Sequence, residues 1–173
     1  GPWTNYFHCG IDNTEQIQCW GSDNYGQVSD TPTGTFTSLV SGQSHACGIL
    51  NSGLVECWGA DDDGQVSNKP SGTFTSLSSS GYHICGINTA GSIECWGANS
   101  VGQVSNAASG TFSHITSGYS FSCGIDSTNL VKPKAPVIVN MKQIPEVVFY
   151  DRGAMILPDQ LVVEKKQRPY FMS

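Results

Sequence analysis

The stretch Cys47-Gly-Ile-Leu-Asn-Ser-Gly-Leu-Val-Glu-Cys57-Trp58-Gly59 decides the fold of this 173-residue chain, because both of its ends recur at a fixed interval. The tripeptide Cys-Gly-Ile begins at positions 38 residues apart: Cys9, Cys47, Cys85 and Cys123. The tripeptide Cys-Trp-Gly recurs with the same step, at Cys19, Cys57 and Cys95. A fixed period of about 20 to 50 residues is typical of solenoids and propellers. The chain is therefore predicted to be a tandem array of 38-residue repeats.

Each repeat contains a predicted β-hairpin. In the second repeat, Asn51-Ser52-Gly53 is a turn cluster, and the segments that flank it are short, apolar and partly alternating. A hairpin centred on Ser52 places Cys47 opposite Cys57, at a spacing that a disulfide can span. The same register pairs Cys9 with Cys19 and Cys85 with Cys95, so three disulfides are predicted. The alternatives are buried reduced thiols and a zinc site, and the absence of Cys-x-x-Cys clips disfavours zinc.

The remaining motifs of the repeat predict further short strands and no helix. Gly-Gln-Val-Ser follows each Cys-Trp-Gly, and a segment related to Gly-Thr-Phe-Thr-Ser-Leu precedes each later Cys-Gly-Ile. These alternating segments read as strands, which gives about three strands in each unit. One tryptophan in each unit is expected to fill the core between neighbouring units: Trp20, Trp58 and Trp96. The fold class is therefore predicted to be all-β.

Composition and charge narrow the functional classes. Seven cysteines with three register-matched pairs indicate an oxidising compartment, and hence an extracellular or cell-surface location. No run of 18 apolar residues is present, so no membrane-spanning helix is expected. Residues 1–129 hold ten acidic side chains and one basic side chain, Lys69, whereas residues 130–173 hold seven basic and four acidic ones. The acidic repeats argue against nucleic acid as a partner.

These motifs resemble the regulator-of-chromosome-condensation-type repeat over about residues 3–130. The resemblance is strongest to the secreted, cysteine-containing versions in bacterial surface proteins and in the ectodomains of crinkly-type plant receptor kinases. It implies blades of a β-propeller, commonly seven, that serve in binding. One member of that family is a β-lactamase inhibitor, and the founding member acts on a small GTPase and on chromatin. The founder's basic chromatin-binding extension has no counterpart here, so the resemblance implies no nuclear role.

The fourth repeat departs from this pattern and divides the chain. Pro133 stands where a cysteine is expected, so Cys123 is predicted to be a free buried thiol or an intermolecular one. Residues 1–130 are predicted to form three and a half repeats, and residues 131–173 a non-repeat C-terminal arm. The arm has β-prone apolar runs interrupted by prolines. It is interpreted as edge strands or an extended arm that packs on the repeats, or as a docking arm for a partner subunit.

Three repeats and a fraction are too few for an ordinary closed propeller of about four to eight blades. Unclosed blades leave sheet edges that favour association. Three arrangements remain open at this point. Two chains complete one ring as a homo-oligomer, the chain is part of a longer protein, or the units stack as an open β-repeat array.

The chain shows no motif of a catalytic, cofactor or metal site. His45 and His83 share one repeat position, which favours a structural role for both. The run Asp61-Asp62-Asp63-Gly64 lacks the alternating ligands and distal glutamate of an EF-hand, so a solvated turn is expected rather than a calcium loop. No nucleophile elbow or phosphate loop is present. We therefore expect no cofactor and no enzyme; a hydrolase that uses His45 or His83 with the Asp loop is the minor alternative.

Function is expected in the loops between Trp-Gly and Gly-Gln, which differ between units while their frames do not. Candidate binding residues in these loops are Asp23, Tyr25, Asp61, Asp62, Asp63 and Asn99. Aromatic and acidic side chains suit a protein or glycan partner, an electropositive one above all. The sequence thus predicts a secreted, non-enzymatic recognition module. The alternative is a structural subunit of an extracellular, fibre or virion assembly that docks through its C-terminal arm.

Overall fold

The structure, a computed structural model, describes residues 6–106, 108–126, 131–134, 149–151 and 154–156, and every regular element in those ranges is a β-strand. The first sheet pairs β1 (Phe7–Ile11) with β2 (Ile17–Gly21). The second sheet has the order β3 (Phe36–Ser41), β4 (His45–Leu50), β5 (Val55–Gly59). The third sheet has the order β6 (Phe74–Ser79), β7 (His83–Asn88), β8 (Ile93–Gly97). The predicted all-β class is confirmed.

The fourth unit also forms a three-stranded sheet, with β10 (Ser122–Asp126) between β9 (Phe112–Ser117) and β11 (Val131–Lys134). Strand β11 pairs antiparallel with β10 and places Cys123 opposite Pro133. The sheet thus continues four residues beyond position 130, where the composition changes. Farther along, β12 (Phe149–Asp151) and β13 (Ala154–Ile156) pair with each other. The rest of the expected arm lies outside the described residues.

The hairpin register is the one that a turn centred on Ser52 requires. Cys47 lies opposite Cys57, and Cys9–Cys19 and Cys85–Cys95 are opposed in the same way. All three pairs are disulfides, each with a Cα–Cα distance of 4.1 Å. Each disulfide therefore ties together the two strands of the hairpin on which a unit is built.

A close approach between strands explains the glycine of each later Cys-Gly-Ile motif. The ring of Phe36 on β3 crosses the backbone of Gly48 on β4, where an added Cβ would lie 2.7 Å from its Cδ1. The same relationship joins Phe74 to Gly86 and Phe112 to Gly124, at 2.6 Å and 2.7 Å. Any larger residue would collide with the ring, so the phenylalanine of one motif and the glycine of the other form one packing unit.

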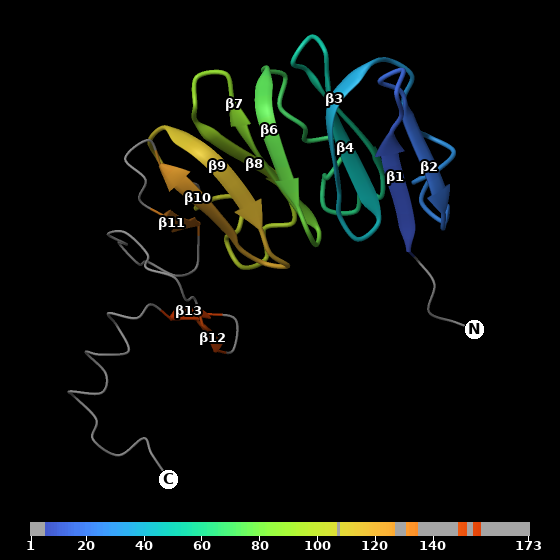
Figure 1. Ribbon diagram of the computed structural model, residues 1–173. Helices are drawn as coiled ribbons and strands as arrows, with labels where there is room; N and C mark the ends of the chain where they lie inside the picture. The colour runs from blue at the N-terminus through green and yellow to red at the C-terminus, as the bar shows by residue number, and fades with distance from the viewer. Residues whose placement is uncertain (1–5, 107, 127–130, 135–148, 152–153, 157–173) are drawn as a thin grey trace, which may run out of the picture.

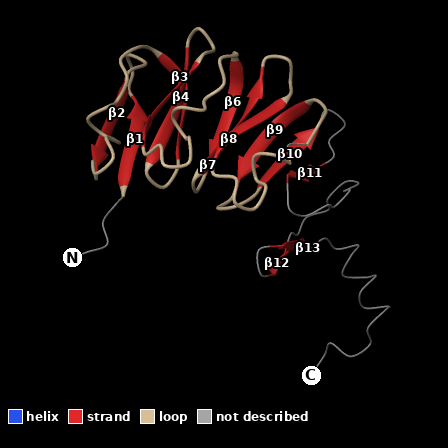
Figure 2. Cartoon of the chain, turned by 180° about the vertical axis from the view of Figure 1, so that it is seen from behind, coloured by secondary structure: helices blue, strands red, loops and turns tan. Residues whose placement is uncertain are grey.

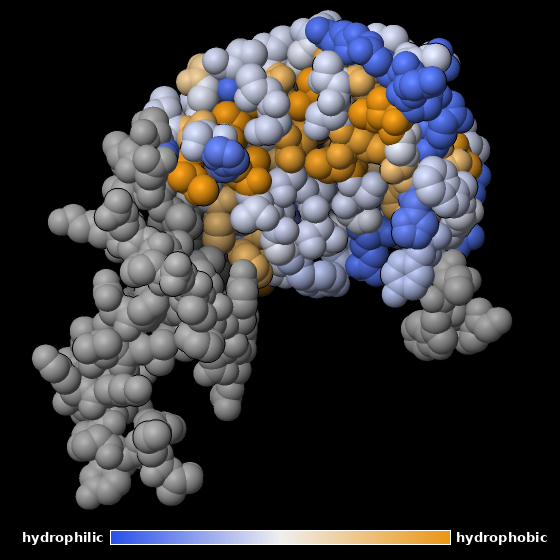
Figure 3. Space-filling model, viewed as in Figure 1, coloured by the Kyte–Doolittle hydropathy of each residue, from blue (hydrophilic) through white to orange (hydrophobic). Residues whose placement is uncertain are grey.

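The sheets from β1–β2 to β9–β11 lie side by side in chain order and form an open fan, seen from opposite sides in Figure 1 and Figure 2. Strands β3, β6 and β9 contact one another in succession, so the first strands of these units converge on one side of the fan. In the space-filling view, apolar atoms gather in a band across these strands (Figure 3). Because the β1–β2 and β9–β11 sheets stand at opposite ends, the described sheets form part of a propeller, with no closed ring.

Two of the three tryptophans fill the core between units, as predicted. Trp58 packs with Phe7, Ile17 and Phe36, while Trp96 packs among apolar side chains of the second and third units, and each is only 3% exposed. Trp20 differs, because it is 56% exposed. The expectation of a core position for Trp20 is corrected here: within the described residues, no sheet covers its side of the β1–β2 hairpin. Burial of this tryptophan requires a neighbouring sheet.

No helix among the described residues has the length and apolarity needed to cross a lipid bilayer.

Candidate functional site

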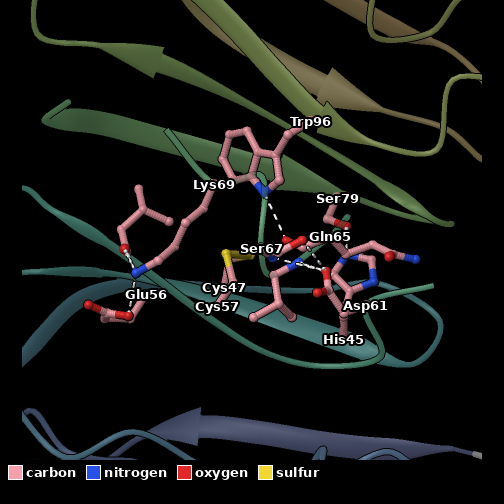
Figure 4. Close-up of a disulfide and its surroundings, with 12 residues drawn as sticks. His45, Cys47, Glu56, Cys57, Asp61, Gln65, Ser67, Lys69, Ser79 and Trp96 are labelled. Carbon is pink, nitrogen blue, oxygen red and sulfur yellow. Dashed lines mark hydrogen bonds and ion pairs between the residues drawn. A yellow bond between two sulfur atoms is a disulfide. The ribbon is translucent and has the colours of Figure 1, made fainter. Parts of the chain in front are cut away.

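Three of the six candidate binding residues hold their own loops together. Oδ1 of Asp61 accepts hydrogen bonds from the backbone N–H groups of Val66 and Ser67, at 2.8 and 2.9 Å (Figure 4). Asp23 and Asn99 hold the equivalent loops with the same pattern. The backbone N–H of Ser67 is the main cause that lowers the pKa of Asp61. These side chains are loop clamps, and the Oδ1 atom of each is hydrogen-bonded within its own loop.

A buried glutamine fixes the position two residues after each clamp. Oε1 of Gln27 accepts the backbone N–H of Tyr25 at 2.7 Å, and Gln65 and Gln103 hold Asp63 and Val101 in the same manner. The backbone at this repeat position is thus set by a buried side chain, while the side chain itself points outward. Tyr25 is 48% exposed, Val101 is 46% exposed, and Asp63 is also exposed. One rigid frame therefore displays a phenol, a carboxylate and an isopropyl group at equivalent places.

The structure adds two tyrosines to these loops. Tyr82 and Tyr119 lie in the turns that join β6 to β7 and β9 to β10, and their rings meet edge to face with centroids 5.7 Å apart. A hydrogen bond with Tyr119 is the main cause that raises the pKa of Tyr82, followed by burial and by the charges of Tyr119, Tyr25 and Asp63. Geometry also brings Asp63 near Tyr82, because a Cβ on Gly97 would lie 2.6 Å from the carbonyl oxygen of Tyr82 and 3.4 Å from Cγ of Gln65, the residue that holds Asp63. We call Tyr25, Asp63, Tyr82 and Tyr119 the tyrosine cluster.

Tyr82 and Tyr119 were not among the predicted site residues, although the sequence carried a signal for them. The turns at 42–44, 80–82 and 118–120 are equivalent in the repeat, and tyrosine replaces serine at position 82 and glycine or glutamine at position 119. The backbone N–H of Gln43 donates to the carbonyl of Gly81 at 3.0 Å, so adjacent turns contact each other directly. Variation at equivalent positions, applied to these turns as well as to the loops, would have identified both tyrosines.

The surroundings of the tyrosine cluster are acidic. Residues 6–126 carry ten acidic side chains and a single basic one, a net charge of −9. The ammonium of Lys69 contacts Oε2 of Glu56 at 2.5 Å and the carbonyl of Val55 at 3.0 Å (Figure 4). The one basic group of residues 6–126 is therefore already paired on the second sheet.

The repeat-equivalent histidines lie between sheets, in the core. His45 and His83 are both buried, and their Nε2 atoms contact Ser79 at 3.2 Å and Ser122 at 2.8 Å. Because Ser79 donates its hydroxyl proton to the carbonyl of His83, His45 must donate Nε2–H to Ser79 and is the Nε2–H tautomer. Burial, followed by the charge of His83, lowers the pKa of His45 to about 4. Each ring joins its own unit to the next one, and neither is open to a substrate.

The remaining sulfur and acidic groups form no further site within the described part of the chain. Cys123 is a free, buried thiol whose pKa is raised by burial. Across the described ranges, no group of three His, Cys, Asp or Glu side chains is arranged to hold a metal ion. Asp62 is exposed on the same loop as the clamp Asp61.

Comparisons with known proteins agree with this architecture. Residues 36–65 match the family model described as Regulator of chromosome condensation (RCC1) repeat. The ectodomain of the receptor kinase CR4 from Physcomitrella patens is 28% identical, with a TM-score of 0.63 over 74% of this chain and 38% of that chain. The crinkly ectodomain of ACR4 from Arabidopsis thaliana is also 28% identical, with a TM-score of 0.55 over 68% of this chain and 42% of that chain.

A more distant structure shows the same fold. Prp20p from Saccharomyces cerevisiae is 14% identical, with a TM-score of 0.61 over 87% of this chain and 47% of that chain. No match was found among curated proteins. The chain thus spans between 38% and 47% of the length of these three solved structures.

The fold and the fixed loops define a class of protein: a disulfide-stapled β-repeat scaffold built as part of a propeller. Residues 36–65 are similar to the regulator-of-chromosome-condensation repeat, and the chain as a whole is similar to the two receptor ectodomains.

Proposed function

We propose that this chain is a non-enzymatic binding module that recognises a protein partner outside the cell through side chains displayed by its loops. One observation carries the proposal. At the position of Tyr25, Asp63 and Val101, a buried glutamine fixes the backbone in each of the first three units, while the exposed side chain differs completely. A rigid frame with variable exposed side chains is how loops on a scaffold carry recognition.

Two further observations support the extracellular setting. Three disulfides staple the hairpins, and disulfides persist in oxidising compartments. The solved structures at 28% identity are ectodomains of receptor kinases, so the same repeat serves on cell surfaces in those proteins. The buried histidines and the clamped carboxylates favour recognition over hydrolysis, because the imidazole rings are shielded from solvent and Oδ1 of Asp61 is hydrogen-bonded within its own loop.

The test replaces exposed loop residues of the first and second units with the residues that the third unit has at the same positions. A variant with Tyr25→Val, Asp62→Ser and Asp63→Val carries at each position the residue of the third repeat, so its loops keep a sequence compatible with the frame. Capture of cross-linked extracellular proteins by wild type and variant is compared by quantitative mass spectrometry. Asp30→Asn, which installs the residue found at positions 68 and 106, is the matched control. We expect partners that the control retains and the variant loses; equal capture by all three proteins would overturn the proposal.

A second candidate function is a subunit of a larger assembly, and the exposure of Trp20 favours it. Trp58 and Trp96 show that this position packs against a neighbouring sheet, whereas Trp20 has none among the described residues. Light scattering on the full chain distinguishes the two candidates. A higher-order species that Trp20→Gln dissociates would support assembly, and a monomer at micromolar concentration would remove this candidate.

A further inference from the structure

We propose that the tyrosine cluster binds a lysine or arginine side chain of a basic segment in the partner. This inference rests on the proposed function and names the chemistry of the partner. Three features support it: the arrangement of the cluster, its negative charge, and the pairing of Lys69, the one basic side chain of residues 6–126.

The arrangement of the cluster provides aromatic rings from three different units. Tyr25 comes from the loop after the first hairpin, Tyr82 from the turn of the third sheet and Tyr119 from the turn of the fourth. The edge-to-face contact of Tyr82 and Tyr119, at 5.7 Å, leaves the rings at a steep angle of 81° to each other. Tyr119 is 60% exposed and Tyr25 is 48% exposed, so their rings are accessible. Tyrosine faces attract ammonium and guanidinium groups within about 6 Å of the ring centroid.

Asp63 supplies a formal negative charge in the loop that Gln65 places near the backbone of Tyr82. Its backbone N–H is held by Gln65 at 2.8 Å, whereas its side chain is exposed and takes no part in the clamp, which belongs to Asp61. A carboxylate next to aromatic faces provides both the ion pair and the ring contact that a guanidinium takes. The equivalent positions, Tyr25 and Val101, have no charge, so the carboxylate distinguishes this place on the scaffold.

Residues 6–126 offer the cluster no unpaired cation. In residues 6–126 the only basic side chain is Lys69, which is paired with Glu56 on the second sheet. The net charge of −9 over the same residues adds a long-range attraction for a basic segment, which raises the association rate at low salt. A neutral glycan would stack on the tyrosines but gain nothing from this field. The charge therefore favours a basic protein segment.

The experiment measures binding of a dye-labelled hexaarginine peptide to the full chain by fluorescence anisotropy, with hexaglutamate and maltohexaose as comparison probes. Each variant takes the residue that the repeat uses at the equivalent position of another unit: Asp63→Val, Tyr82→Ser and Tyr119→Gln. We expect wild type to bind hexaarginine only, with an affinity that falls as salt rises. Each variant should lose affinity about tenfold, which corresponds to about 1.4 kcal/mol. Asp30→Asn, which removes one charge elsewhere on the loop, should change affinity less than about twofold.

Three outcomes would overturn the inference. Equal weakening by Asp63→Val and Asp30→Asn would assign binding to the overall charge alone. Binding of maltohexaose that Tyr119→Gln abolishes would assign the cluster to a glycan. Absence of hexaarginine binding by wild type, together with partner capture that still depends on Tyr25 and Asp63, would overturn the basic ligand while leaving the proposed function intact.

Discussion

The indole Nε1 of Trp58 donates a hydrogen bond of 2.9 Å to the backbone carbonyl of Gln27, a residue of the preceding repeat. The next unit repeats this bond between Trp96 and Gln65 at 3.0 Å. The side chains of the same two glutamines also hold the loops that contain Tyr25 and Asp63. Each tryptophan therefore joins the packing between sheets to the placement of an exposed loop, and loss of one tryptophan contact should disturb both.

We expect Trp58→Phe to lower the free energy of unfolding by about 1 to 3 kcal/mol, because the carbonyl of Gln27 loses its donor in a buried place. Urea denaturation under oxidising conditions measures the change. Trp20→Phe is the matched control, and it should stay within about 0.5 kcal/mol of wild type because Trp20 is exposed. Equal destabilisation by the two substitutions would show that the bond to Gln27 contributes nothing specific.

The stability of the chain should depend on pH through His45. Its pKa is about 4 in the folded chain, against an ordinary value of 6.5, because the buried ring resists a charge. Its Nδ1 has no hydrogen-bond partner among the described residues, so a proton placed there would be buried without an acceptor. The unfolded chain binds the extra proton between pH 6.5 and 4, so the stability from this group is complete above pH 6.5 and falls as the pH drops towards 4.

The expected loss over this interval is about 3 kcal/mol, which follows from the difference of the two pKa values. Unfolding free energies at pH 7.0 and 4.5 measure it. His45→Phe, which installs the residue found at the equivalent position 121, should flatten the dependence over this range. A pH profile that is the same in wild type and His45→Phe would contradict the assignment to His45. Asp12, with a pKa of about 2, titrates below this window and leaves it undisturbed.

The parts of the structure that could be predicted from the sequence depend on contacts within one unit. The register of Cys47 with Cys57 follows from the turn between them, so it needs no knowledge of neighbouring sheets. The exposure of Trp20 could not be predicted, because its burial depends on whether another sheet lies beside the hairpin. The contact of Tyr82 with Tyr119 could not be predicted from the sequence either, because it depends on how adjacent sheets place their turns.

The roles within the loops illustrate the same limit. Asp61 and Asp62 are adjacent acids in one loop and looked alike as binding candidates. The structure separates them, because Asp61 accepts two backbone N–H groups while Asp62 is exposed. The recurrence of Asp or Asn at positions 23, 61 and 99 was the available sign of a structural role. Geometry within the loop was needed to recognise it.

Substitutions at these two acids should therefore differ in effect. We expect Asp61→Ala to lower the free energy of unfolding by about 1 kcal/mol, because two loop N–H groups lose their acceptor. Asp61→Asn should be close to wild type, since Asn99 holds the equivalent loop through the same oxygen. Asp62→Ala should change stability by less than about 0.5 kcal/mol. Thermal unfolding of the three variants tests this ranking, and similar losses for Asp61→Ala and Asp62→Ala would contradict the clamp.

Glu15 lies at a turn position of the first unit where the backbone conformation favours glycine. Its φ of 63° matches Gly53 and Gly91, which take 85° and 83° at the equivalent turn position, and only glycine adopts this region without steric cost. The backbone carbonyl of Glu15 accepts the N–H of Phe36 at 2.8 Å, just as Gly53 does for Phe74, so the turn is retained.

We expect Glu15→Gly to raise the free energy of unfolding by about 0.5 to 1 kcal/mol. This is the relief of backbone strain less the added conformational freedom of the unfolded chain. Gly53→Ala is the matched reversal and should lower stability in the same urea titration, because its new Cβ would also lie 3.1 Å from Thr73. A Glu15→Gly variant less stable than wild type would show that the exposed contact of Glu15 with Asn51 outweighs the backbone strain.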